Sequence, residues 1–238
     1  MPSSRPNPYQ VGSPTRSSTR GWGTTDPACL FPGHRGDNAL VRKVAEPARG
    51  VRQLIIASAL RQMGERGYHG TSTRDIAEGA HITVASIYHH FASKQAILQH
   101  ITVSALEDSI AKTRGAVLRA GSHPLDQLQA IVRVWTIFHA TSRDQAIVTA
   151  TELRSLDGEG RRVVITLRDQ QEQIFRDVVQ YGVDEGAFLT KLPTDATRWI
   201  INTGQQVSTW FRPDGPLTAD ALADRYAILA AAIVESVR

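Results

Sequence analysis

The residues in this chain best suited to chemistry are small and polar side chains between positions 83 and 89. A helix that enters the major groove of DNA must be slim where it meets the groove floor, and Val84, Ala85 and Ser86 keep it so. Hydrogen bonds or apolar contacts to base edges and phosphates can come from Thr83, Val84, Ser86, Tyr88 and His89. We therefore expect this segment to read double-stranded DNA.

Four other residues are candidates for contacts with phosphates. Thr73 begins a predicted helix, where free backbone amides attract anions. Lys94 also stands at a helix N-terminus, where a cation gains nothing from the helix dipole, so an external phosphate would explain it. Arg49 and Arg52 lie at the start of an earlier helix. Each residue alone also fits an ordinary helix or core position, and it is their order along the chain that favours DNA.

Two short helices joined by a tight turn must position these side chains, which is the arrangement of a helix-turn-helix. Ser72 and Asp75 have the spacing of a capping box at the start of the first helix, and Gly79-Ala80 closes the turn. Thr83 can cap the recognition helix, residues 84–90. Ile87 and Phe91 should face the core of the small domain.

The rest of the chain also has helical periodicity, and no segment reads as a strand, so the predicted fold class is all-α with about nine helices. A helix from Pro47 precedes the motif, and one capped by Ser93 runs from Lys94 towards Leu118. Later helices are predicted over 125–141, 143–153, 161–181, 194–211 and 218–237. This gives a DNA-binding domain over 47–95 and a larger helical domain over 96–238. Residues 1–40, rich in Pro, Ser and Arg, are expected to be a disordered tail.

Composition narrows the possible classes of function. The net charge is +4, and residues 42–100 carry eight Lys and Arg against four Asp and Glu, so the basic excess lies on the proposed reader. The absence of a long apolar run predicts no membrane partner, and the single Cys29 fits a reducing cytoplasm, where the protein would associate with the nucleoid. Neither a metal-ligand cluster nor a catalytic motif is present, so we expect no cofactor, no metal and no enzyme.

The pattern from Thr71 to Ala80, followed by Ser86-Ile-Tyr-His-His-Phe-Ala-Ser-Lys94, resembles the TetR family of bacterial transcription regulators. The resemblance covers residues 49–98. It implies an all-helical homodimer whose N-terminal domain binds a palindromic operator and whose C-terminal domain binds a small ligand that releases the DNA. It places Thr73, Thr83, Val84, Ser86, Tyr88, His89 and Lys94 at the DNA-facing positions.

The helical domain should then supply both a dimer interface and a ligand pocket. The last two helices mix small and large apolar residues, so they fit either a close interface between two copies or ordinary core. The predicted interface residues are Trp199, Thr203, Val207, Trp210, Leu222, Tyr226, Leu229 and Ile233. The predicted ligand contacts, which fit core positions equally well, are Trp135, Phe138, His139, Leu167, Gln171, Phe175, Trp199 and Gln206.

Residues 210–218 narrow the choice of effector. This segment resembles the link between the last two helices in TetR members that control fatty-acid, steroid or aromatic-acid catabolism, several of which respond to acyl-CoA thioesters. The expected function is therefore a repressor released by a small hydrophobic ligand, such as an acyl-CoA or a lipid-like acid. The alternatives are a regulator of a drug-efflux gene that responds to hydrophobic drugs, and a helical interaction module without DNA binding.

Overall fold

The computed structural model describes the backbone of residues 38–237 and the side chains from residue 50 onward. Over this range the chain is all-α, as predicted, with nine α-helices, one 3₁₀ helix and no strand. The helices are α1 (Asn38–Arg66), α2 (Thr73–Gly79), α3 (Val84–His90), α4 (Lys94–Arg119), α5 (Pro124–Thr141), α6 (Arg143–Thr151), η1 (Glu152–Ser155), α7 (Gly158–Asp184), α8 (Pro193–Trp210) and α9 (Ala219–Ile233). None of the helices described is long and apolar enough to cross a membrane.

Side-chain caps fix the starts of most helices, because the first backbone amides of a helix have no partner within it. Ser72, Thr83, Ser93 and Thr218 each accept a hydrogen bond from the amide three residues later. At α2 the bond is reciprocal, since the carboxylate of Asp75 accepts one from the amide of Ser72 at 2.7 Å. The predicted capping box and the caps at Thr83 and Ser93 are therefore confirmed.

Several predicted boundaries were wrong. α1 begins at Asn38 rather than Pro47, and most of the predicted tail lies outside the described residues. α7 begins three residues early because Asp157 caps it, accepting from the amide of Gly160 at 2.7 Å. α8 starts at Pro193, which suits the first turn because proline needs no hydrogen-bond acceptor there. α9 ends at Ile233, after which the chain forms one isolated bridge between Phe188 and Ser236.

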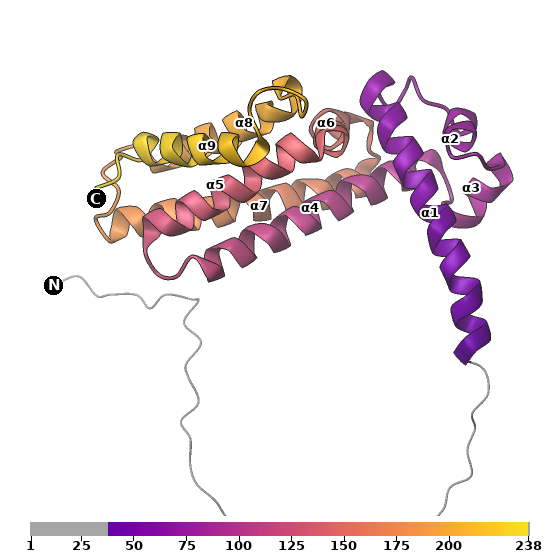
Figure 1. Ribbon diagram of the computed structural model, residues 1–238, viewed down its shortest axis with the longest axis horizontal. Helices are drawn as coiled ribbons and strands as arrows, with labels where there is room; N and C mark the ends of the chain where they lie inside the picture. The colour runs from indigo at the N-terminus through magenta and orange to yellow at the C-terminus, as the bar shows by residue number, and fades with distance from the viewer. Residues whose placement is uncertain (1–37, 238) are drawn as a thin grey trace, which may run out of the picture. The chain divides into compact units, whose positions relative to one another are not determined.

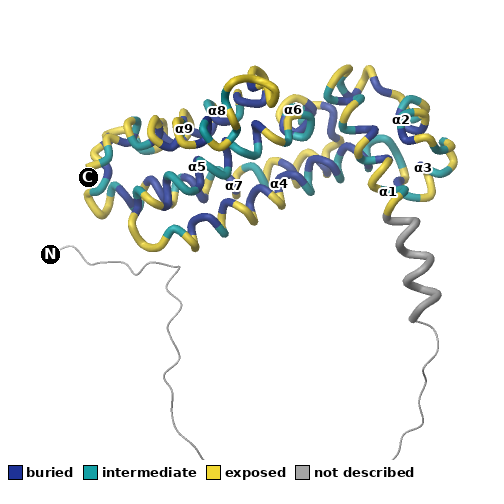
Figure 2. The backbone as a smooth tube through the Cα atoms, in the orientation of Figure 1, coloured by how far each residue is buried: buried dark blue, intermediate teal, exposed yellow. Residues whose placement is uncertain are grey.

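The described part of the chain has two large apolar clusters. Figure 1 shows the helices that contribute to them, and Figure 2 shows the buried stretches of those helices in dark blue. The first, which we call the reader core, joins α1, α2, α3 and the start of α4 to residues of α6 and α7. The second, the bundle core, lies among α4, α5, α7, α8 and α9. α4 contributes to both, with Ile97 and Ile101 in the reader core and Ile110 and Val117 in the bundle core. The reader core thus contains residues from both sides of the predicted boundary at 95/96.

Close helix packing in the bundle depends on two glycines. A Cβ on Gly204 would lie 2.4 Å from Cδ1 of Trp135, whose indole N–H donates to the carbonyl of Ile201 at 3.0 Å. A Cβ on Gly182 would lie 2.1 Å from Cδ2 of the buried Phe188. Gly204 therefore serves contact between α5 and α8 of the same chain, so its small size is explained without a partner protomer.

Candidate functional site

Helix α1 positions α2 through hydrogen bonds to its backbone. The hydroxyl of Ser58 donates to the carbonyl of Ile76 at 2.9 Å, and the amide of Gln62 donates to the carbonyl of Asp75 at 2.6 Å. The helices approach so closely at Gly79 that a Cβ there would lie 2.5 Å from Oγ of Ser58. Gly79 is thus required by packing against α1.

In the turn between α2 and α3, the residue with left-handed backbone is His81. The sequence had placed the turn at Gly79 and Ala80. His81 has a φ of 55°, in the left-handed region that favours glycine. The backbone amide of His81 donates to Glu78 at 3.0 Å, and that of Ile82 donates to Ala77 at 3.0 Å. These bonds close the C-terminus of α2 and aim the chain into α3.

Helix α3 presents one face to the reader core and the other to solvent. Ile87 is fully buried and Phe91 is 5% exposed, as predicted, while Tyr88 is 53% exposed and His89 is also exposed. Thr83 is exposed, and its Oγ1 accepts from the amide of Ser86 at 3.2 Å. Val84, Ser86 and Thr73 are half-buried. The outer face of α3 can therefore offer hydroxyl, phenol and imidazole groups to a partner.

Lys94 has partners inside the protein, so its position does not need an external anion to explain it. Its ammonium donates to the carbonyls of Tyr68 at 2.8 Å and Thr71 at 2.6 Å, and lies 4.0 Å from the centroid of the Tyr68 ring. Burial lowers the pKa of Lys94 from its ordinary value. Lys94 thus ties the start of α4 to the turn before α2. One N–H remains for a phosphate, and that contact stays a prediction.

Arg52 likewise has partners inside the protein and packs against Phe91 of the reader core. Its guanidinium lies 4.6 Å from the centroid of the Phe91 ring, and Nη1 lies 3.0 Å from Nε2 of His100. Because arginine can only donate, Nε2 of His100 must accept, so His100 is neutral in this arrangement. Burial and the charge of Arg52 lower the pKa of His100. The side chain of Arg49 lies outside the described residues.

The predicted ligand contacts divide into two groups. Trp135, His139, Gln171 and Phe175 are buried, and Phe138 and Leu167 are partly buried, but Trp199 is 54% exposed and Gln206 is exposed. The last two point away from the interior because they occupy the outer face of α8. Their contact with a ligand stays a prediction.

His139 is neutral within the buried group. Its ring centroid lies 4.2 Å from that of Trp135, and Nδ1 donates to the carbonyl of Trp135 at 2.8 Å. Burial lowers the pKa of His139 to about 4. It is therefore a hydrogen-bonding group in the interior at neutral pH.

Sequence reasoning missed three buried threonines of the bundle, namely Thr113, Thr136 and Thr149. The amide of Gln171 donates to Oγ1 of Thr113 at 3.0 Å, but its Oε1 has no partner among the described residues. The hydroxyl oxygens of Thr136 and Thr149 are also buried and unpartnered within that range. Polar side chains at core-facing helix positions were the signal that could have identified them.

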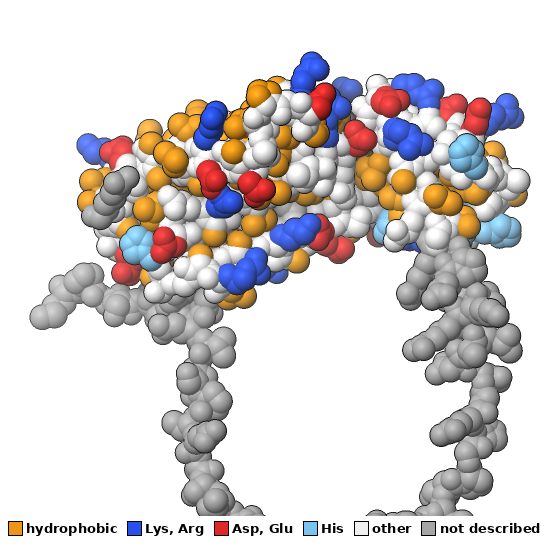
Figure 3. Space-filling model, viewed as in Figure 1, with side chains coloured by type: hydrophobic (Ala, Val, Ile, Leu, Met, Phe, Trp, Pro, Cys, Tyr) orange, Lys and Arg blue, Asp and Glu red, His pale blue; other side chains and the backbone are white. Residues whose placement is uncertain are grey.

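The predicted interface residues also divide. Val207 and Leu222 are buried with Ala140 and Phe211 in an apolar cluster of the protomer, and their place in an interface stays a prediction. Trp199, Trp210 and Leu229 are about half exposed, and Ile228, which the prediction omitted, is 66% exposed. Thr203, Tyr226 and Ile233 are half-buried. Orange hydrophobic side chains accordingly show over α8 and α9 in Figure 3.

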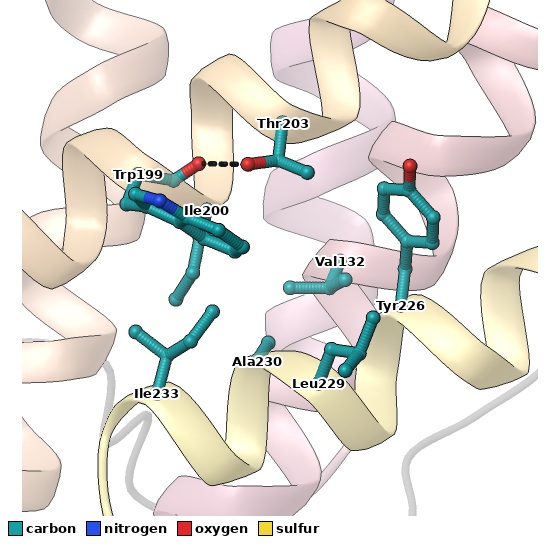
Figure 4. Close-up of a pocket in the computed structure, with 8 residues that line it drawn as sticks. All are labelled: Val132, Trp199, Ile200, Thr203, Tyr226, Leu229, Ala230 and Ile233. Atoms are coloured by element: carbon teal, nitrogen blue, oxygen red, sulfur yellow. Dashed lines mark hydrogen bonds between the residues drawn. The ribbon is translucent and has the colours of Figure 1, made fainter.

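A shallow groove runs between α8 and α9 (Figure 4). Its lining is almost entirely apolar, and Trp199 of α8 and Leu229 of α9 stand on its rims. The lining residues are Val132, Trp199, Ile200, Thr203, Tyr226, Leu229, Ala230 and Ile233. We call this exposed surface the α8–α9 face.

Comparison with known families gives two matches. Residues 55–101 match the model described as bacterial regulatory proteins of the tetR family. Residues 121–234 match the model described as the tetracyclin repressor-like C-terminal domain. The first match contains α2, α3 and Lys94. The second contains the buried His139 and Gln171 and the α8–α9 face.

Similar proteins are also transcriptional regulators. The HTH-type transcriptional repressor KstR2 of Mycobacterium tuberculosis is 31% identical over 186 residues, which are 77% of this chain and 92% of the relative. The solved structure of that ketosteroid regulator has a TM-score of 0.72 at 28% identity, covering 79% of this chain and 95% of that one. The structure of AibR in complex with isovaleryl coenzyme A and operator DNA shares the fold, with a TM-score of 0.70 at 22% identity, covering 79% of this chain and all of that one. This chain therefore belongs to the TetR family of bacterial regulatory proteins and is a DNA-binding transcriptional regulator.

Proposed function

We propose that the protein is a repressor that binds a palindromic operator as a dimer, with α3 of each protomer in the major groove. This proposal depends on one observation, which is that α3 has a buried apolar face and an exposed polar face. Ile87 anchors the helix in the reader core, while Thr83, Tyr88 and His89 are exposed. A short helix fixed by its apolar side and polar on the other is what reading base edges requires.

Contacts with the DNA backbone would set the position of α3 on the duplex. The N-terminus of α2 carries Thr73 and free amides, which suit a phosphate. Basic and histidine side chains are visible over the α1–α3 region in Figure 3. Binding should therefore weaken steeply as the salt concentration rises.

A second copy of the chain is the proposed occupant of the α8–α9 face. A two-fold symmetric operator needs two readers at a fixed spacing, and an exposed apolar face suits a symmetric contact. Leu229→Glu on this face should convert a dimer to a monomer in sedimentation velocity experiments. Leu118→Glu is a matched control, since Leu118 is 66% exposed on α4, away from this face. A Leu229→Glu variant that sediments like the wild type would contradict this interface.

The proposed effector is a small hydrophobic ligand, either an acyl-CoA or a lipid-like acid. The polar side chains of His139 on α5 and Gln171 on α7 are buried in the apolar interior of the bundle. Ligand sites are mostly apolar with a few polar groups of this kind. The names of the relatives support this class, since KstR2 is a ketosteroid regulator and AibR was solved with isovaleryl coenzyme A. Ligand binding would favour a conformation in which the two α3 helices no longer match the operator.

Fluorescence anisotropy with labelled DNA from upstream of the protein's own gene tests the DNA-binding part. Tyr88→Ala should weaken specific binding by roughly 5- to 150-fold, the usual cost of a lost base contact. His123→Ala is the control, because His123 is exposed at the start of α5. Binding that is insensitive to salt and sequence, or unaltered in Tyr88→Ala, would overturn the proposal.

Release of DNA tests the effector class. We expect a panel of acyl-CoAs and free acids to lower the anisotropy of the wild-type complex, while hydrophobic drugs leave it unchanged. Release by the drugs alone would instead favour control of an efflux gene. A reporter gene behind the bound promoter should be expressed more strongly when the regulator is deleted. Weaker expression would contradict repression.

A further inference from the structure

Arg168 of α7 is a partly buried cation without a carboxylate partner in the described part of the chain. Two other arginines of the bundle pair with carboxylates, since Arg176 pairs with Glu172 and Arg133 pairs with Asp224. The one hydrogen bond that Arg168 makes within this range goes from Nη2 to the backbone carbonyl of Thr149, at the end of α6. Its remaining N–H groups are therefore available.

The residues around Arg168 include other polar atoms without partners. The side-chain oxygen of Thr149 is buried and unpartnered among residues 50–237, and the residue is 9% exposed. Gln171 lies one turn further along α7, on the same side of the helix as Arg168, and is 3% exposed with Oε1 unpartnered. The neighbouring Leu167 packs against both the reader core and the bundle core. This turn of α7 thus brings a cation and spare polar groups to the place where the two cores meet.

A guanidinium in this position is costly to the protein. Removing a charge from water without supplying a counterion destabilises the charged form, and burial does lower the pKa of Arg168. The group nevertheless stays protonated at neutral pH, because free arginine has the highest pKa of all side chains. An anion that reached the site would relieve this cost, and guanidinium can bind carboxylate or phosphate through two parallel hydrogen bonds.

We propose that Arg168, assisted by the hydroxyl of Thr149, anchors the anionic group of the effector. This inference rests on the proposed function and deepens it, because it specifies that the effector must carry a carboxylate or a phosphate. The apolar part of such a ligand would lie along the interior that Leu167 adjoins. An uncharged hydrophobic molecule would leave the cation unpaired and should bind more weakly.

The test is calorimetric titration of four probes, namely octanoyl-CoA, coenzyme A, octanoate and the uncharged methyl octanoate. It uses the full-length wild type, Arg168→Gln and Arg162→Gln. Arg162 is the matched control because it is exposed on the same helix. We expect Arg168→Gln to weaken binding of the anionic probe by roughly 10- to 100-fold, as for other hydrogen bonds to a charged group. Arg162→Gln should bind like the wild type, and methyl octanoate should bind all three proteins equally weakly.

The probes also distinguish the two sources of anion. A loss confined to octanoate assigns the carboxylate to Arg168, whereas a loss shared by octanoyl-CoA and coenzyme A assigns the phosphates. Equal binding of the anionic probes to Arg168→Gln and the wild type would overturn the inference. So would a wild type that binds none of the anionic probes, or that binds methyl octanoate as tightly as octanoate.

DNA anisotropy on the same samples separates this inference from the proposed function. A wild type that fails to bind DNA refutes the proposed function. Normal DNA binding with unchanged probe affinity in Arg168→Gln refutes only the role of Arg168. Because Arg168→Gln removes an unpaired charge, its melting temperature without ligand should equal or exceed that of the wild type. If it does not fold, Thr149→Val should still weaken anion binding, and unaltered affinity in that variant would contradict the site.

Discussion

Replacing Lys94 by Met separates a structural role from a DNA contact. The change keeps the apolar stem but removes the ammonium that donates to the carbonyls of Tyr68 and Thr71. A hydrogen bond to a charged donor contributes about 1.5–3 kcal/mol when buried, and a cation over an aromatic ring adds about 0.5–1 kcal/mol. Because Lys94 is only partly buried, we expect a total loss of about 2–3 kcal/mol. For a domain of this size the melting temperature should fall by roughly 5–10 °C.

Calorimetry and salt titration of DNA binding together provide the assay. If the interior bonds dominate, Lys94→Met melts earlier but keeps the salt dependence of its DNA affinity. Lys112→Met is the control, since Lys112 is exposed and pairs only with Asp108, so its loss should cost less than about 0.5 kcal/mol. An unchanged melting temperature, with a slope of log affinity against log salt reduced by about 0.9, would refute the structural role.

Three further changes test the packing, the turn and the interior. Gly182→Ala should lower the free energy of unfolding by about 2–3 kcal/mol, because the new Cβ would overlap the Phe188 ring; urea unfolding like that of the wild type would contradict this. His81→Gly should raise the free energy of unfolding by about 1 kcal/mol by relieving the left-handed backbone, and a lower melting temperature would count against it. Since burial lowers the pKa of His139 to about 4, the unfolded chain takes up a proton below pH 6.5 that the folded protein binds only near pH 4. Stability should therefore fall by about 3 kcal/mol as the pH drops across that window. His139→Gln should flatten this part of the profile, and parallel profiles for the two proteins would exclude His139 as its cause.

Local signals were sufficient to predict the reader motif. The capping box at Ser72, the cap at Thr83 and the buried Ile87 depend on residues within one or two turns of each other, so spacing alone identified them. The position of the turn residue was wrong because glycine usually marks a left-handed residue, yet here Gly79 serves contact with α1. The helix starts at Gly158 and Pro193 were missed where the first turn lacked an apolar pattern.

Long-range contacts could not be predicted from spacing. Nothing near Lys94 in the sequence shows that it reaches the carbonyl of Tyr68, 26 residues earlier. Apolar residues of α8 and α9 look alike in sequence, but the structure buries Val207 and Leu222 and leaves Trp199 and Leu229 exposed. Periodicity shows that a helix has an apolar side, but it does not show which neighbour covers that side.

The sharing of α4 between both apolar cores has a mechanical consequence. Its first turns pack among the residues around Ile97 and its last turns among those around Val117, so a rearrangement in either core acts on the same helix. A helix of 26 residues is about 39 Å long, so a tilt of about 5° around its centre moves each end by about 1.7 Å. In a symmetric pair this changes the distance between the two reading helices by roughly 3 Å, against a groove repeat of about 34 Å. In the proposed dimer, a shift of this size in the bundle would change the spacing of the two α3 helices relative to the DNA groove.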